Sequence, residues 1–140
     1  MVMSEEIIHT KISVLQKVDY ILNGCISRIE SILVQNLPES VKAQLVVPKI
    51  SKGEQYLQMP YRILDCPRIF KGNDIFAVRT MFLWGNYFSV TLHLSGVFLN
   101  TFRSKLIAAQ QKLPATFYIC IHNDQWQHDF TSKIMLLYIL

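Results

Sequence analysis

The chain has 140 residues, of which 51% are hydrophobic and 17% are charged, and its formal net charge is +4. This composition excludes a disordered chain, and the length favours one domain, residues 1–140, with a core of its own. The excess of positive charge lies in residues 51–105, but it is scattered and accompanied by no nucleic-acid-binding motif, so we do not expect a nucleic-acid partner.

The chain contains three cysteines, Cys25, Cys66 and Cys120, and their spacing matches no metal-ligand or disulfide framework. The first residues also lack the basic and apolar regions of a signal peptide. Together these features predict a cytoplasmic protein, and the sequence indicates no cofactor.

The first predicted element is a long helix over about residues 5–35, with Ser4 as its N-cap. Apolar residues recur at alternating steps of three and four, with one polar break at Asp19: Ile8, Ile12, Leu15, Leu22, Ile26, Ile29 and Leu33. A helix of this length exceeds the width of a compact domain of this size. We therefore expect the helix either to bend at Gly24 or to pack against another chain.

A short second helix is expected to open at Pro38 and to reach about Leu45. Residues 48–60 are predicted to form a loop. Residues 61–66 are predicted to form a strand that Pro67 ends, because proline interrupts the hydrogen bonds of a sheet.

Residues 67–74 read as a loop with a Gly72–Asn73 turn, and residues 75–96 as a β-hairpin with a two-residue loop at Gly85–Asn86. This register pairs Leu83 with Phe88 and places these residues on the core face: Ala77, Arg79, Met81, Leu83, Phe88, Val90, Leu92 and Leu94. Thr80 to Phe102 carries no charge and is long enough to span a membrane, but its period of two favours a buried hairpin, so we expect no membrane insertion.

Beyond the hairpin, a helix is predicted from Asn100 or Thr101 to about Lys112, and a strand over residues 116–122. Residues 134–140 are all apolar and fit a helix or a strand equally well. The order of elements predicts an α+β fold, in which the long N-terminal helix and the short second helix pack on an antiparallel sheet of about four strands.

The candidate ligand-binding residues are Asp65, Arg79, His93 and Trp84. An arginine on an apolar face needs a compensating group, so Arg79 is expected either to form a structural ion pair with Asp65 or Glu54, or to clamp an anion or carboxylate. His93 lies on the neighbouring strand, and Trp84 belongs to an aromatic cluster that could stack on a ring.

Two further sets of residues have side chains suited to chemistry. Imidazole and carboxylate groups at His122, Asp124 and His128 suit a transition metal, but their spacing matches no known metal-binding pattern, so no metal is assigned. Cys66 could act as a nucleophile if His93 served as its base, although a buried and inert cysteine is the alternative.

Several short segments resemble a small family of bacterial proteins to which no activity is assigned: KISKGE (49–54), MPY (59–61), LD (64–65), PR (67–68), Phe70, DIFA (74–77), RTMF (79–82), WG (84–85) and TLHL (91–94). The resemblance covers about a third of the chain and transfers no catalytic residue. It implies a bacterial, intracellular protein.

The sequence therefore favours a binding or protein-interaction module over an enzyme. The long helix and the C-terminal apolar run present more apolar surface than one sheet readily covers. We expect a homodimer, with the N-terminal helix at or near the interface and Asp19 at its polar break, and a further protein partner is compatible with such a module. The alternative is a small hydrolase-like or metal-dependent enzyme with a site around Asp65, Arg79 and His93, to which Cys66 and His122 could contribute.

Overall fold

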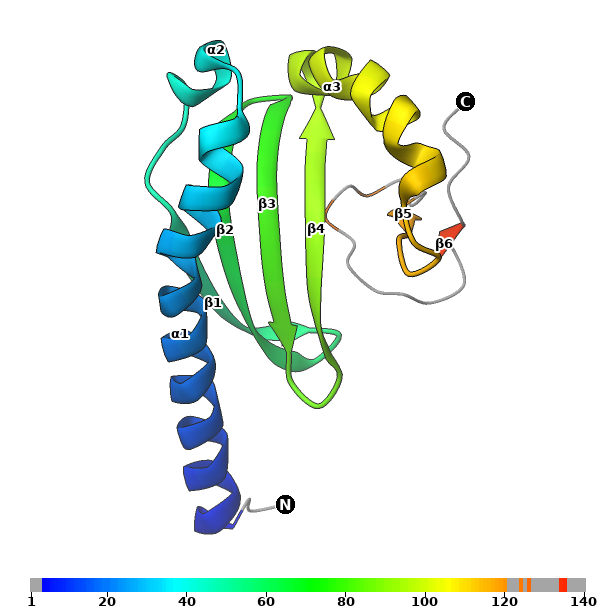
Figure 1. Ribbon diagram of the computed structural model, residues 1–140. Helices are drawn as coiled ribbons and strands as arrows, with labels where there is room; N and C mark the ends of the chain where they lie inside the picture. The colour runs from blue at the N-terminus through cyan, green and yellow to red at the C-terminus, as the bar shows by residue number, and fades with distance from the viewer. Residues whose placement is uncertain (1–3, 121–123, 125, 127–133, 136–140) are drawn as a thin grey trace. The chain divides into compact units, whose positions relative to one another are not determined.

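The computed structural model of the chain describes residues 4–120, 124, 126, 134 and 135 (Figure 1). The chain forms two compact units, Met1–Leu99 and Asn100–Leu140, and each is described by itself. That the two units make up one domain stays a prediction. The expected α+β class is confirmed, because a long helix packs on a four-stranded antiparallel sheet in the first unit.

Helix α1 spans Glu5–Leu33 and continues into a short 3-10 turn. The predicted cap is confirmed, since the Ser4 hydroxyl accepts a hydrogen bond from the Ile7 amide at 3.4 Å. The helix runs through the exposed Gly24 without a break, so a fold-back at this residue does not occur. Helix α2 follows Pro38 as predicted but is shorter than expected, Glu39–Lys42.

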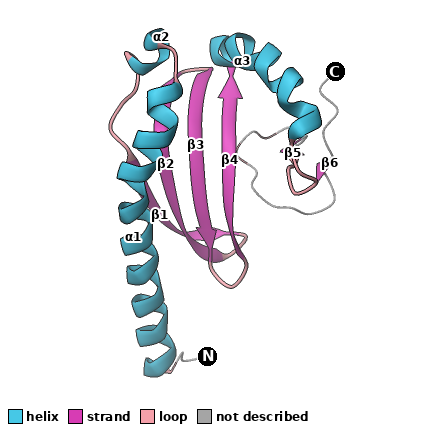
Figure 2. Cartoon of the chain, in the orientation of Figure 1, coloured by secondary structure: helices cyan, strands magenta, loops and turns pink. Residues whose placement is uncertain are grey.

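The sheet consists of β1 (Lys49–Tyr56), β2 (Met59–Lys71), β3 (Asp74–Leu83) and β4 (Tyr87–Ser95). The strands are antiparallel and lie in the order β1-β2-β3-β4, which makes a simple meander (Figure 2). In the described part of the chain, no helix is both long and apolar enough to cross a membrane.

Two predictions about β1 and β2 were wrong. Strand β1 occupies most of the predicted loop 48–60, because an edge strand needs little of the apolar alternation that marks a buried one. Strand β2 continues past Pro67, since the register shifts between Asp65 and Arg68 and the irregularity accommodates a residue without an N–H. The Gly72–Asn73 turn is confirmed by the pairing of the residues on either side of it.

The predicted register of the hairpin was also wrong. Leu83 pairs with Tyr87, so the loop has three residues, 84–86, and not two. Gly85 lies at φ 69°, and the Asn86 amide donates to the Leu83 carbonyl at 3.1 Å. Because side chains alternate along a strand, this one-residue shift moves every residue of β4 to the opposite face. The apolar side chains of β4 therefore leave the face that carries Arg79.

Helix α1 packs on one face of the sheet, chiefly against β2, as Figure 1 shows. The centre of this contact is formed by Val18 and Leu22 of the helix with Leu64 and Cys66 of β2. Partly buried side chains surround it: Val14, Ile26, Ile29, Ile50 and Phe82. On the opposite face, Ile63, Met81 and Leu83 form a second buried cluster, against which three tyrosines pack: Tyr56, Tyr61 and Tyr87.

Helix α3 spans Gly96–Ala109 and begins four residues before the predicted start. Its beginning is set by Asp74 of the neighbouring turn, whose Oδ1 accepts a hydrogen bond from the Val97 amide at 2.9 Å. Gly96 has φ 57° and lies so close to Asp74 that a side chain there would overlap the carboxylate. The Ser95 hydroxyl donates to the Asn73 carbonyl at 2.6 Å, which ties the two turns of this sheet end together.

In the second unit, a 3-10 turn follows α3, and β5 (Ile119–Cys120) pairs with β6 (Ile134–Met135) in a separate two-stranded sheet. The strand predicted over residues 116–122 is present at residues 119–120, was wrong for residues 116–118, which are turn and loop, and at residues 121–122 lies outside the described part of the chain. Residues 134 and 135 are strand, and residues 136–140 lie outside the described part of the chain.

Candidate functional site

Asp65 and Arg79 form a cross-strand ion pair, as the structural alternative predicted. They lie directly opposite each other on β2 and β3, with Arg79 Nε 2.7 Å from Asp65 Oδ1 and Nη2 2.9 Å from Oδ2. Their side chains are only 12% and 6% exposed. One edge of the guanidinium is thus held by an internal carboxylate, while Glu54, the other proposed partner, pairs with Lys11 at 2.6 Å.

The corrected register places further polar residues on the same face as this pair. Thr91 lies opposite Arg79, His93 lies opposite the neighbouring Ala77, and Ser89 lies opposite Met81. Ser89 and His93 are buried. We refer to Asp65, Arg79, Ser89, Thr91 and His93 as the polar row, and the sequence-based register had wrongly placed His93 on the other face from Arg79.

Trp84, the fourth candidate, does not belong to the polar row. It is half-buried in the hairpin loop, and its backbone N–H donates to the Pro60 carbonyl at 3.0 Å. It lies five residues beyond Arg79 in the chain, which corresponds to about 16 Å in an extended backbone. The structure therefore brings together three of the four candidate ligand-binding residues.

Cys66 lies on the face of the sheet that α1 covers, away from the polar row. Burial raises the pKa of its thiol to about 11, and the nearby Glu30 carboxylate adds to the shift. A thiol with this pKa is protonated at neutral pH, and His93 is on the opposite face. The residues needed for a cysteine nucleophile are thus separated by the sheet.

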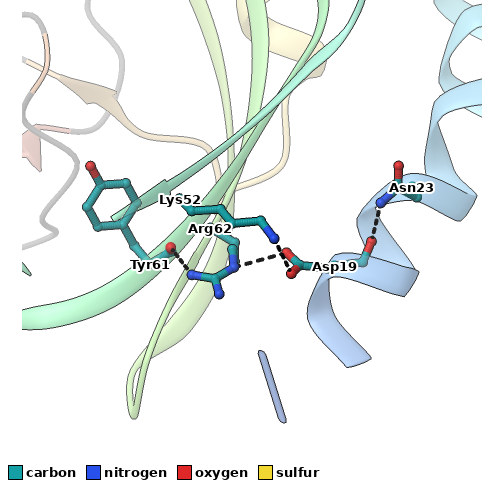
Figure 3. Close-up of polar contacts among 5 residues, drawn as sticks. All are labelled: Asp19, Asn23, Lys52, Tyr61 and Arg62. Carbon is teal, nitrogen blue, oxygen red and sulfur yellow. Dashed lines mark hydrogen bonds and ion pairs between the residues drawn. The ribbon is translucent and has the colours of Figure 1, made fainter. Parts of the chain in front are cut away.

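Asp19 forms a second polar cluster, which joins α1 to the sheet (Figure 3). Its Oδ1 is 3.0 Å from Arg62 Nε, and its Oδ2 is 3.0 Å from Lys52 Nζ. Arg62 also donates from Nη1 to the Tyr61 carbonyl at 3.0 Å, and the Asn23 amide donates to the Asp19 carbonyl at 2.8 Å. The polar break of the helix is therefore paired within the chain, and its place at an interface between chains stays a prediction.

Sequence reasoning did not find this cluster. The available signal was that Asp19 interrupts the apolar stripe while Arg62 interrupts the helix-facing residues of β2, two positions before Leu64. Arg62 is buried, with a side chain only 10% exposed, so a carboxylate on the facing helix was required.

The metal-binding candidates lie in the region that the structure describes only in part. Asp124 is exposed, and its Oδ1 accepts a hydrogen bond from the Trp126 amide at 2.9 Å. His122 and His128 are outside the described residues. Among the residues that the structure does describe, no group of three or more histidine, cysteine or acidic side chains is arranged to hold a metal ion.

Exposed apolar side chains occur at several places in the first unit, Tyr20, Ile21 and Val47 among them, and two groups of them bear on an interface. At the beginning of α1 these are Ile7, Ile8 and Ile12. On β4 they are Phe88, Val90 and Leu92, which we call the β4 patch, and Val90 is 71% exposed. The β4 patch lies on the face of the sheet that α1 covers, because Phe88 pairs with Phe82 and their rings are 4.9 Å apart. The helix thus covers only part of this face.

No family model, curated protein or solved structure matches this chain.

Proposed function

We propose that this chain is a protein-interaction module that acts as a homodimer. The observation that carries the proposal is the exposure of the β4 patch, which continues the apolar face that α1 buries elsewhere. Contiguous apolar surface of this kind usually marks a protein interface. A cytoplasmic, bacterial setting is part of the same proposal.

The ends of the apolar stripe on α1 support the proposal further. The middle of the stripe packs on the sheet, whereas Ile8 and Ile12 lie beyond that contact and are exposed. This part of the helix extends past the end of the sheet in Figure 1. The helix end and the β4 patch are thus two separate apolar surfaces, and a second chain could pack on either one.

Sedimentation velocity at 1–100 µM tests the proposal. We expect a mass twice the 16.3 kDa of the chain at the upper concentrations, with dissociation on dilution. A mass of one chain throughout this range contradicts the homodimer. A parallel measurement in 1 M NaCl should leave the dimer intact, because apolar contacts are not screened by salt.

A second candidate function is a small-ligand or enzyme site on the polar row. It is favoured by one observation, namely that Asp65, Arg79 and His93 share a face of the sheet. The test is a thermal-shift screen of small carboxylates and phosphates against the chain and its His93→Gln variant. A shift that depends on His93 supports the site, and no shift with any compound at millimolar concentration counts against it.

A further inference from the structure

We propose that two copies of this chain join edge to edge through β4, so that their four-stranded sheets form one continuous antiparallel sheet across a two-fold axis. This inference rests on the proposed function and deepens it, because it names the surface on which the homodimer forms. The partner is a second copy of the same chain.

The outer edge of β4 carries no further strand of the four-stranded sheet. Strand β4 is the last strand of the sheet, and none of the other strands that the structure describes pairs with its outer edge. Along such an edge, every second residue presents its backbone N–H and C=O outward. The nine residues of β4 include no charged residue, no proline and no glycine. Edge strands with this composition are templates for another strand.

The opposite edge of the sheet, β1, has the features that prevent such pairing. It carries Lys49, Lys52 and Glu54, and its register is irregular between Gly53 and Tyr56. Charges and bulges are the usual means by which edge strands avoid other chains. Strand β1 carries charges and an irregular register, and β4 has neither. This difference indicates that the second copy adds at β4.

The sequence of β4 is complementary to itself when it pairs antiparallel about Thr91. Apolar and polar residues alternate symmetrically around this position, so apolar residues meet apolar ones and polar residues meet polar ones. Val90 lies opposite the partner's Leu92, and Phe88 lies opposite the partner's Leu94. No like charges face each other, and pairing centred on Thr91 gives the longest possible overlap of the two strands.

This arrangement also involves two features of the single chain, the exposed β4 patch and the buried Ser89 hydroxyl. A two-fold axis perpendicular to the sheet keeps each face on its own side, so the β4 patches of both copies form one apolar strip between the two α1 helices. On the other face, Ser89 lies opposite the partner's His93. The Ser89 hydroxyl is buried and has no hydrogen-bond partner among the described residues, and pairing would bring a polar side chain beside it.

A pair of charge-introducing variants separates this interface from one formed by the helix. Val90→Lys places a charge in the centre of the β4 patch, whereas Ile12→Lys places the same charge on the exposed end of α1. By sedimentation equilibrium, we expect Val90→Lys to raise the dimer dissociation constant at least tenfold and Ile12→Lys to leave it unchanged. The reverse pattern overturns the β4 interface but keeps the homodimer. An unmodified chain that is monomeric at 100 µM overturns both.

Cross-linking tests the register and does not depend on weakening the dimer. Thr91→Cys is made in a chain whose three native cysteines are replaced, and the product is treated with a short bismaleimide at 20 µM. We expect rapid formation of a covalent dimer, because residue 91 of each copy lies at the two-fold axis. Gln55→Cys, an exposed position on β1 at the opposite edge of the same sheet, is the matched control and should react at least tenfold more slowly. Equal rates for the two variants, in a chain that sediments as a dimer, overturn the inference and leave the proposed function standing.

Discussion

The Asp65–Arg79 pair shows how a buried charge constrains its neighbours. Both side chains are almost fully buried and hold each other by two hydrogen bonds. Removal of the carboxylate alone leaves a guanidinium without its counter-ion in a poorly hydrated place. The Asp65 carboxylate is therefore needed mainly to compensate the buried charge of Arg79, and the pair adds little net stability of its own.

We predict that Asp65→Leu lowers the free energy of unfolding by about 3–5 kcal/mol, because it strands the Arg79 charge. The double variant Asp65→Leu with Arg79→Met should lose much less. Urea denaturation measures both, with Glu39→Gln as the control, since the exposed pair of Glu39 with Lys42 contributes less than about 1 kcal/mol. A double variant as unstable as the single one would contradict the prediction.

The cysteines differ in reactivity for a physical reason. Burial raises the pKa of Cys66 to about 11, whereas Cys25 is exposed. At pH 8 in a Cys120→Ser chain, we expect one thiol to react quickly with Ellman's reagent and Cys66 to react at least ~100-fold more slowly, because only the thiolate attacks. Two fast thiols in the folded chain would contradict this.

The same shift predicts how stability depends on pH. The folded chain holds the Cys66 proton more tightly than the unfolded chain, whose thiol titrates near 9.0. The contribution of the neutral thiol is thus complete below pH 9 and is lost as the pH rises toward 11. Cys66→Ala should flatten the fall in stability over this window, as measured by urea denaturation at several pH values.

At the scale of the elements, Asp19 fixes α1 to the sheet. Its carboxylate faces Arg62, which is buried, and Lys52, which is 60% exposed. We predict that Asp19→Ala lowers the free energy of unfolding by about 2 kcal/mol, because it leaves Arg62 without its partner. Lys52→Ala, measured in the same urea titrations, should change it by less than about 0.5 kcal/mol. Equal changes in the free energy of unfolding for the two variants would contradict the prediction that the buried Arg62 requires the Asp19 carboxylate.

Two glycine-to-alanine substitutions, one in the hairpin loop and one in α1, should change the stability of the chain in opposite directions. Gly85 has φ 69° and open space around its missing side chain, so Gly85→Ala should destabilise by about 1 kcal/mol through backbone strain alone. Gly24 also has open space but lies within α1, so Gly24→Ala should stabilise by about 0.5–1 kcal/mol. Thermal unfolding of both variants measures the difference.

The elements also show where sequence reasoning succeeded and where it could not. The long helix and its Ser4 cap follow from local patterns, and the pairing of Arg79 with Asp65 follows from the need to compensate a buried charge. The register of the hairpin does not follow from local patterns, because Gly85–Asn86 fits a two-residue or a three-residue loop and the flanking residues are apolar in either case. The position of His93 within the polar row depended on that register. The pairing of Asp19 with Arg62 depends on how a helix lies on a sheet, which local patterns do not determine.

At the scale of the whole molecule, two edges of one sheet differ in kind. Strand β1 is charged and irregular, whereas β4 is uncharged, continuous and lined by exposed apolar side chains. A single copy leaves the β4 patch in water. Edge pairing between two copies takes the outer backbone groups of β4 out of solvent and places the two β4 patches side by side. This difference is the physical argument for the proposed homodimer built on β4.

Hydrogen exchange of the β4 amides at two concentrations tests this claim most directly. At 100 µM we predict that the outward-facing amides between Phe88 and Leu94 are protected at least tenfold more than at 1 µM, while those of β1 do not change. The protection should disappear in Val90→Lys at both concentrations. Protection of β4 that is the same at 1 µM and 100 µM in the unmodified chain would contradict a dimer formed through this edge.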